Sequence, residues 1–131
     1  MSLTTILHDV FSGLVHRPAT VRYPVERRPV PAHLRGALTW NPKGCTGCAL
    51  CVKDCPSNAI ELITLDKAAK RFVIRYHSDR CAFCAQCVQN CRFECLGMSP
   101  EQWELAALNK KPFTVLLGNQ ADVEQFVARG A

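Results

Sequence analysis

The chain contains no apolar run that approaches the roughly 20 residues of a membrane-spanning helix. Its N-terminus shows no basic leader, long apolar segment or small-residue cleavage site, so we expect no export. It also lacks a glycine-rich phosphate loop and a nucleophile–base pattern, and its four histidines share no metal-binding spacing. These absences predict a cytoplasmic chain with reduced thiols and no catalytic site of its own.

Cysteine, in contrast, is abundant, with nine among 131 residues. "CTGCALCVKDC" begins at Cys45 and "CAFCAQCVQNC" at Cys81, and each run places cysteines at i, i+3, i+6 and i+10. The runs lie 81 − 45 = 36 residues apart, and residues 37–60 match residues 73–96 at this offset. Each half is too short to bury a core alone, so we expect the two halves to fold together. The other matched pairs are Leu38 with Ile74, Trp40 with Tyr76, Ala49 with Ala85, Val52 with Val88 and Ile60 with Leu96.

The spacing of the cysteines indicates cubane [4Fe–4S] clusters, which need one thiolate at each iron corner. A C-x2-C-x2-C loop can present three thiolates, but the chain cannot wrap round the cube to supply the fourth. In the bacterial C-x2-C-x2-C-x3-C-P run, the last cysteine ligates the other cluster. We therefore predict two clusters as cofactors. Each cluster takes three cysteines from one run and the last cysteine of the other run. One ligand set is Cys45, Cys48, Cys51 and Cys91, and the other is Cys81, Cys84, Cys87 and Cys55.

Two other uses of the cysteines are open. Zinc sites use separated C-x2-C pairs, which would leave the third and fourth cysteines of each run without a role. A disulfide framework would need an oxidising compartment, for which the sequence shows no signal. The repeated spacing favours iron–sulfur clusters over both.

Arg92 breaks the repeat, because it follows Cys91 where Pro56 follows Cys55. Proline removes a backbone N–H, whereas Arg92 restores that donor and adds a cation near the cluster. Both changes would favour the reduced cluster, since hydrogen bonds to sulfur and local charge tune its potential. The alternative is a surface arginine without an electronic effect.

Cys95 is the ninth cysteine, and it falls on Ala59 in the repeat. A free cysteine behaves as a small buried hydrophobic residue. We therefore expect Cys95 to pack beneath the cysteine loop, and not to serve as a ligand in place of Cys91.

The N-terminal segment differs in kind from the repeat. Seven apolar residues between positions 3 and 15 share one helical face, and Pro18 follows the helix that they predict. Residues 20–36 contain three prolines and are expected to be extended. Residues 1–44 hold six Lys/Arg against two Asp/Glu, a net charge of +4, whereas the remainder holds ten against nine, +1. Because the proline-rich arm separates the helix from a small domain, we expect the apolar face to dock on a membrane-facing surface or a partner subunit. The alternative is that it packs on the domain itself.

Further elements are expected between and after the cysteine runs. Apolar alternation over residues 60–76 predicts two strands joined around "DKAAK". A capping box at residues 99–102 predicts a short helix that ends before Pro112. A final helix is expected over residues 119–130.

Residues 37–96 resemble a bacterial-type ferredoxin with two [4Fe–4S] clusters. The longer stretch "ATVRYPVERRPVPAHLRGALTWNPKGCTGCALCVKDCPSNAIEL" resembles the ferredoxin-like subunit I of respiratory complex I. It equally resembles the corresponding small subunit of energy-converting hydrogenases and formate hydrogenlyases. The resemblance covers about residues 3–98. It implies an α+β fold with a pseudo-twofold repeat, made of an amphipathic helix with a docking arm (1–36), a two-cluster domain (37–98) and a helical tail (99–131).

The resemblance implies a peripheral electron relay on the cytoplasmic side of a membrane. Electrons would enter from an upstream iron–sulfur subunit and leave toward a quinone-site or nickel–iron subunit, while residues 1–36 contact a membrane-arm subunit. One alternative is a free soluble ferredoxin that serves cytoplasmic redox enzymes, although free diffusion needs no apolar helix. Another is an iron–sulfur protein that binds nucleic acid, although the basic arm has few aromatic residues for base stacking.

Overall fold

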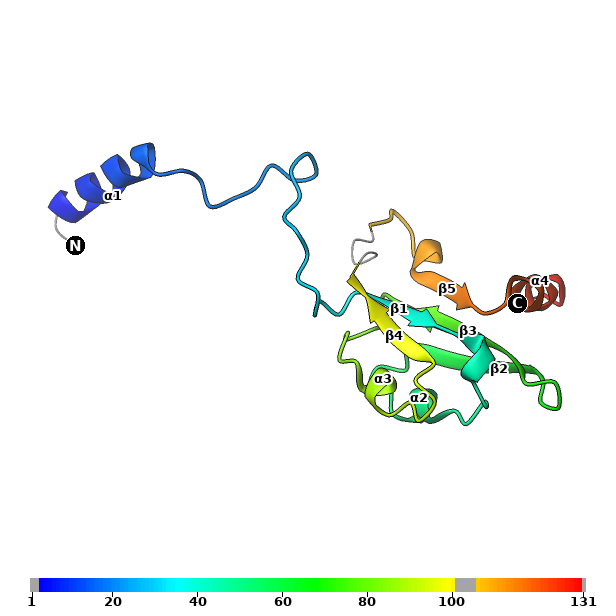
Figure 1. The fold of residues 1–131 in the computed structure, drawn as a ribbon. Helices are drawn as coiled ribbons and strands as arrows, with labels where there is room; N and C mark the ends of the chain where they lie inside the picture. The colour runs from blue at the N-terminus through cyan, green and yellow to red at the C-terminus, as the bar shows by residue number, and fades with distance from the viewer. Residues whose placement is uncertain (1–2, 101–105, 131) are drawn as a thin grey trace.

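The computed structural model describes residues 3–100 and 106–130, and it has a mixed α+β fold (Figure 1). All strands pair antiparallel, in a two-stranded sheet of order β1-β4 and a three-stranded sheet of order β2-β3-β5. The helices are α1 (Leu3–Val15), α2 (Leu50–Lys53), α3 (Gln86–Gln89) and α4 (Gln120–Ala128), with single 3-10 turns at η1 (Pro42–Gly44) and η3 (Lys111–Phe113). The strands are β1 (Ala37–Trp40), β2 (Ile60–Asp66), β3 (Arg71–His77), β4 (Leu96–Ser99) and β5 (Thr114–Leu117).

The two halves of the repeat are joined by their strands. β1 of the first half pairs with β4 of the second, with Leu38 opposite Met98, and β2 pairs with β3, with Leu62 opposite Ile74. The short helices α2 and α3 pack against each other and lie on the same side of the strands (Figure 1). Each half therefore completes the other, as expected from two units too small to bury a core alone. The predicted hairpin around "DKAAK" is confirmed as β2–β3.

The hydrophobic core lies between the sheets and the cysteine-bearing loops. The burial follows from the alternation along the strands, because alternate side chains of a strand point to the same face. Two of the pairs matched in the repeat lie wholly in this core, Leu38 with Ile74 and Ile60 with Leu96, and Trp40, the mate of the buried Tyr76, packs against it. The buried residues of the core are Leu38, Ala59, Ile60, Ile74, Tyr76, Cys87 and Leu96.

The C-terminal segment packs on the domain through a strand that the sequence analysis did not anticipate. β5 adds to the edge of β3, with Leu117 opposite Ile74, and α4 follows within the range expected for the final helix. The buried Asp122 carboxylate of α4 accepts a hydrogen bond from Arg71 Nε of β3 at 2.6 Å. The helix predicted before Pro112 falls partly on residues 101–105, outside the described residues, and residues 106–110 are not helical.

The N-terminal helix α1 lies apart from the domain and is joined to it by the arm (Figure 1). None of the described residues of α1 is buried, and Leu14 on its apolar face is 77% exposed. Residues 17–36 form no helix or strand, as expected from their prolines. The end of the arm is tied to the second cysteine run, because Arg35 Nη1 donates a hydrogen bond to the Cys84 carbonyl at 3.0 Å. No helix among the described residues is long and apolar enough to cross a membrane.

Candidate functional site

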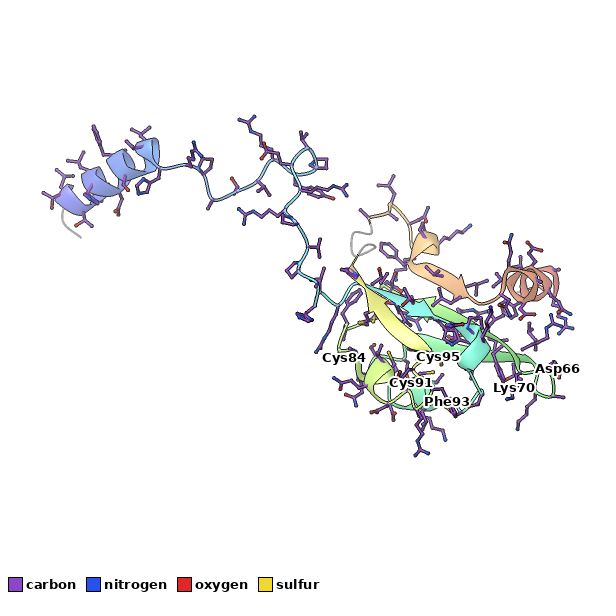
Figure 2. The ribbon with its side chains drawn as sticks, viewed as in Figure 1. Asp66, Lys70, Cys84, Cys91, Phe93 and Cys95 are labelled. Atoms are coloured by element: carbon purple, nitrogen blue, oxygen red, sulfur yellow. The ribbon has the colours of Figure 1, made fainter. Side chains whose placement is uncertain are left out.

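The structure gathers the eight repeated cysteines around two cavities. The first cavity is lined by three cysteines of the first run and the last cysteine of the second: Cys45, Cys48, Cys51 and Cys91. The second is lined by three cysteines of the second run and the last of the first: Cys81, Cys84, Cys87 and Cys55. Figure 2 shows Cys91 next to Cys95, with Cys84 apart from both. The cysteines are grouped around the cavities as the shared-ligand pattern expects, and their role as ligands stays a prediction.

The loops that carry the first three cysteines of each run use unusual backbone conformations at equivalent positions. Gly47 and its repeat mate Phe83 have φ of 71° and 51°, and Ala49 and its mate Ala85 have φ of 57° and 62°. Ala49 and Ala85 directly precede α2 and α3. A left-handed conformation costs roughly 1–2 kcal/mol at a residue with a side chain. Both halves contain such residues, and the left-handed conformation there bends the chain around each cavity.

Burial and mutual proximity oppose ionisation of the innermost thiols. Burial raises the pKa of Cys51 to about 11, and the neighbouring Cys45 and Cys48 add to the effect. Burial likewise raises the pKa of Cys87 to about 11, with Cys81 and Cys55 contributing. Several thiolates can share such a cavity only beside a strongly positive group, because like charges at short range oppose one another.

The last cysteine of each run lies in a pocket of backbone donors. Burial acts against ionisation of Cys55, but hydrogen bonds outweigh it and lower the pKa, including one from the Ala59 N–H at 3.2 Å. At Cys91, hydrogen bonds outweigh burial in the same way and lower the pKa. The backbone donors to Cys55 are Ser57, Ala59 and Ile60, and those to Cys91 are Phe93, Cys95 and Leu96, each 36 residues further on.

Arg92 takes no part in this donor set as far as the described residues show. Its side chain is exposed, and the N–H groups that approach Cys91 belong to residues beyond it. The influence of Arg92 on the reduction potential of the first cluster would therefore come from its charge more than from its backbone N–H. This influence stays a prediction.

Each cavity is lined by one side chain whose buried polar atom has no hydrogen-bond partner among the described residues. Trp40 lines the first cavity and its repeat mate Tyr76 lines the second. The Trp40 Nε1 and the Tyr76 hydroxyl oxygen are buried and have no hydrogen-bond partner among the described residues. An unsatisfied buried donor costs roughly 1–3 kcal/mol, so an acceptor within each cavity would recover that free energy. In the sequence these two residues appear only as a matched pair, and their shared place in the repeat is the one signal of a common role.

The donor set and these orphaned atoms fit a [4Fe–4S] cluster in each cavity. Four cysteines surround each space, as four iron corners require. Sulfide and thiolate sulfurs would serve as the acceptors that Trp40 and Tyr76 lack. No three His, Cys, Asp or Glu side chains in the described part of the chain are placed to hold a single metal ion.

Cys95 is buried, as expected, but it also enters the first cavity. Its side chain is 8% exposed, and its Sγ lies 3.3 Å from the Sγ of Cys91 (Figure 2). It lines the same cavity as the four predicted ligands. Burial, followed by the proximity of Cys91, raises the pKa of Cys95 to about 12.

Comparison with known proteins identifies the class. Residues 44–95 match the family model of the 4Fe-4S dicluster domain, so the chain is a dicluster iron–sulfur protein with two [4Fe–4S] clusters as cofactors. The "NADH-quinone oxidoreductase subunit I 2" of Geobacter metallireducens is 32% identical over 120 residues, which cover 86% of this chain and 91% of the relative. The chain therefore belongs to the NADH-quinone oxidoreductase subunit I family.

Other relatives support the same placement. The "NAD(P)H-quinone oxidoreductase subunit I" of Gloeobacter violaceus is 30% identical over 105 residues, which cover 77% of this chain. The chain spans about half the length of that relative, 50%. A chain in the structure of the membrane-bound sulfane sulfur reductase, "an archaeal respiratory membrane complex", superposes with a TM-score of 0.68. The superposition covers 96% of this chain and 69% of the other at 22% identity, and it confirms the fold.

Proposed function

We propose that this chain is an electron-transfer relay subunit of a membrane-associated oxidoreductase, built around a bacterial-type ferredoxin core. The observation that carries this proposal is the interlocked arrangement of two cavities, each lined by three cysteines of one run and the last cysteine of the other. Clusters bound there would accept and release single electrons. A fourth ligand supplied by the other run would hold the two clusters close together in one small core, which suits electron transfer between them better than independent roles.

The proposed ligands follow from the lining of the cavities. The first cluster would be held by Cys45, Cys48, Cys51 and Cys91, and the second by Cys81, Cys84, Cys87 and Cys55. The described chain offers no other group of thiols of this size. The three backbone donors at each of Cys55 and Cys91 would stabilise the charged thiolates.

The division of labour along the chain is also part of the proposal. Residues 37–98 would hold the clusters, residues 1–36 would dock, and residues 99–131 would brace the core through β5 and α4. The exposed apolar face of α1 is expected to bind another apolar surface, since a contiguous exposed apolar surface marks an interaction site. A membrane-arm subunit on the cytoplasmic side of the membrane would supply that surface, with the basic arm running between them.

The electron partners are proposed from the family. An iron–sulfur subunit would donate, and a quinone-site or nickel–iron subunit would receive. Two of the relatives carry the name of a quinone oxidoreductase, and the "Formate hydrogenlyase subunit 6" of Escherichia coli is 48% identical over 46 residues, so the relatives include both branches. The hydrogen bond from Arg35 to the Cys84 carbonyl supports a docking arm that runs beside the loop of the second proposed cluster.

Affinity purification of the tagged chain from gently solubilised native membranes tests the relay. We expect co-purification of an iron–sulfur subunit, a quinone-site or nickel–iron subunit and membrane-arm proteins. Recovery of the chain alone from the soluble fraction would contradict the proposal and support a free ferredoxin.

A matched pair of variants tests the docking face separately. Leu7→Glu/Leu14→Glu places two charges on the apolar face of α1, and both leucines are exposed in the structure. Thr5→Glu/Ser12→Glu places the same charges on the opposite face at the same spacing. Only the first variant should release the chain from the membrane complex. Equal retention of both variants would exclude docking through this face.

A further inference from the structure

The first cavity contains five thiols, whereas the second contains four. Cys95 is the additional one, and its Sγ lies 3.3 Å from that of Cys91. The equivalent position in the other half of the repeat is Ala59, which is fully buried and has no thiol. The two sites are otherwise matched in ligands and backbone donors, so Cys95 is a difference confined to one of them.

We propose that Cys95 is a reserve ligand for the first cluster, able to replace Cys91 as its fourth thiolate. This inference rests on the proposed function, because it assumes that Cys91 is a cluster ligand. The two sulfurs share one buried space, so either can reach the same corner with a displacement comparable to their separation. The chain thus carries a spare thiol only at the site whose last ligand precedes Arg92 instead of proline.

The backbone around Cys95 favours a local exchange. The Cys95 carbonyl accepts a hydrogen bond from the Asn41 N–H at 2.8 Å, and β4 begins at the next residue. These contacts hold the main chain in place, so the thiol would move by rotation of its own side chain. Cys95 also neighbours Cys45, a proposed ligand of the same cluster. The replacement sulfur therefore lies beside a proposed ligand and lines the same cavity, so it would reach the cluster without opening of the fold.

The exchange conserves charge and electrons. Cys91 leaves its iron as the Cys95 sulfur bonds to that iron, so one iron–sulfur bond breaks and one forms. The proton of the Cys95 thiol passes to the departing Cys91 thiolate across the sulfur–sulfur contact. Neither sulfur is oxidised or reduced, and no other reactant takes part.

Iron and acid-labile sulfide content of the full chain, purified without oxygen, tests this proposal. Cys91→Ala should retain the iron content of the parent protein, because Cys95 supplies the missing ligand. Cys55→Ala, its repeat mate, should lose roughly half of the iron, because Ala59 offers no thiol. Cys91→Ala/Cys95→Ala should fall to the same half content. A loss of half the iron in Cys91→Ala alone would overturn the proposal.

A transplanted thiol gives an independent test that does not depend on the Cys91 variant. Cys55→Ala/Ala59→Cys should recover the iron that Cys55→Ala loses, and Ala59→Cys alone shows whether the buried site accepts the larger side chain. Failure of the double variant to regain iron, with Ala59→Cys fully loaded, would count against the proposal. The paramagnetic resonance spectrum of reduced Cys91→Ala should differ from that of the parent in one cluster only. If the parent chain itself binds half of the iron or none, the proposed function fails, and the two failures are thereby distinguished.

Discussion

Gly47 in the first cysteine loop faces the ring of Phe72 on β3 so closely that a Cβ at Gly47 would lie 2.5 Å from ring carbons. The backbone there has φ of +71°, a conformation that side chains rarely adopt. Through this close approach the loop of the first cavity packs directly against the β2–β3 hairpin. The position of three proposed ligands therefore depends on the packing of one aromatic ring.

Gly47→Ala is expected to destabilise the first site, because the added methyl must displace the Phe72 ring. Overpacking of this kind costs about 1–3 kcal/mol. Gly44→Ala is the matched control, since its Cβ would meet Phe93 O at 3.6 Å, an ordinary contact. Iron content and thermal unfolding of the two variants provide the measurement. Equal stability of both variants would show that the loop does not depend on this approach.

Trp40 and Tyr76 are expected to tune the two clusters separately. Each has a buried polar atom without a partner among the described residues, and each lines one cavity. Loss of a hydrogen bond to sulfur worth about 1 kcal/mol would lower a one-electron potential by about 40 mV. Trp40→Phe should lower the potential of the first cluster, and Tyr76→Phe that of the second. Redox titration followed by paramagnetic resonance would measure both potentials. Unchanged potentials would show that these two side chains donate no hydrogen bond to the clusters.

Arg92 is predicted to raise the potential of the first cluster. Arg92→Pro should therefore lower that potential, and Arg92→Gln separates the two causes because it keeps the N–H and removes the charge. Since the observed donors to Cys91 lie beyond Arg92, we expect Arg92→Gln to reproduce most of the effect. If the parent and Arg92→Pro have the same potential, the arginine is a surface residue without electronic influence.

Asp122 anchors the C-terminal segment, because its carboxylate is 3% exposed and pairs with Arg71. Asp122→Ala would leave that guanidinium without its buried partner, and hydrogen bonds to charged groups contribute about 1.5–3 kcal/mol. Because Arg71 is partly exposed to water, we expect a loss of about 2 kcal/mol in the free energy of unfolding. Hydrogen exchange of the β3–β5 amides should accelerate as the tail loosens.

Glu124→Ala is the matched control for Asp122→Ala on the same helix. Glu124 is exposed, and a surface change of this kind is expected to stay within about 0.5 kcal/mol. Protection of the β3–β5 amides should then remain at the parent level. Similar losses in both variants would mean that α4 is held by its general packing and not by the Asp122 pair.

The hydrophobic pattern within single elements was sufficient to predict much of the fold. The alternation over residues 60–76 predicted the β2–β3 hairpin, and the apolar stripe of residues 3–15 predicted α1, because both signals lie within one element. The strand β5 was missed, since its four residues form a strand only by adding to the edge of β3. The helix expected before Pro112 is not found over residues 106–110, where the local capping signal alone did not decide the structure.

The sequence by itself determined the cofactor class and the repeat, because cluster ligation imposes a spacing that local chain geometry must satisfy. A period of 36 and two equal cysteine runs were enough to predict shared ligands. Only the tertiary structure decided what else surrounds each cavity. The orphaned donors of Trp40 and Tyr76, the contact of Gly47 with Phe72 and the approach of Cys95 to Cys91 all depend on segments brought together by folding. Such contacts leave no periodic trace in the chain, so the sequence shows that the halves differ at Arg92 and Cys95 but not what those differences touch.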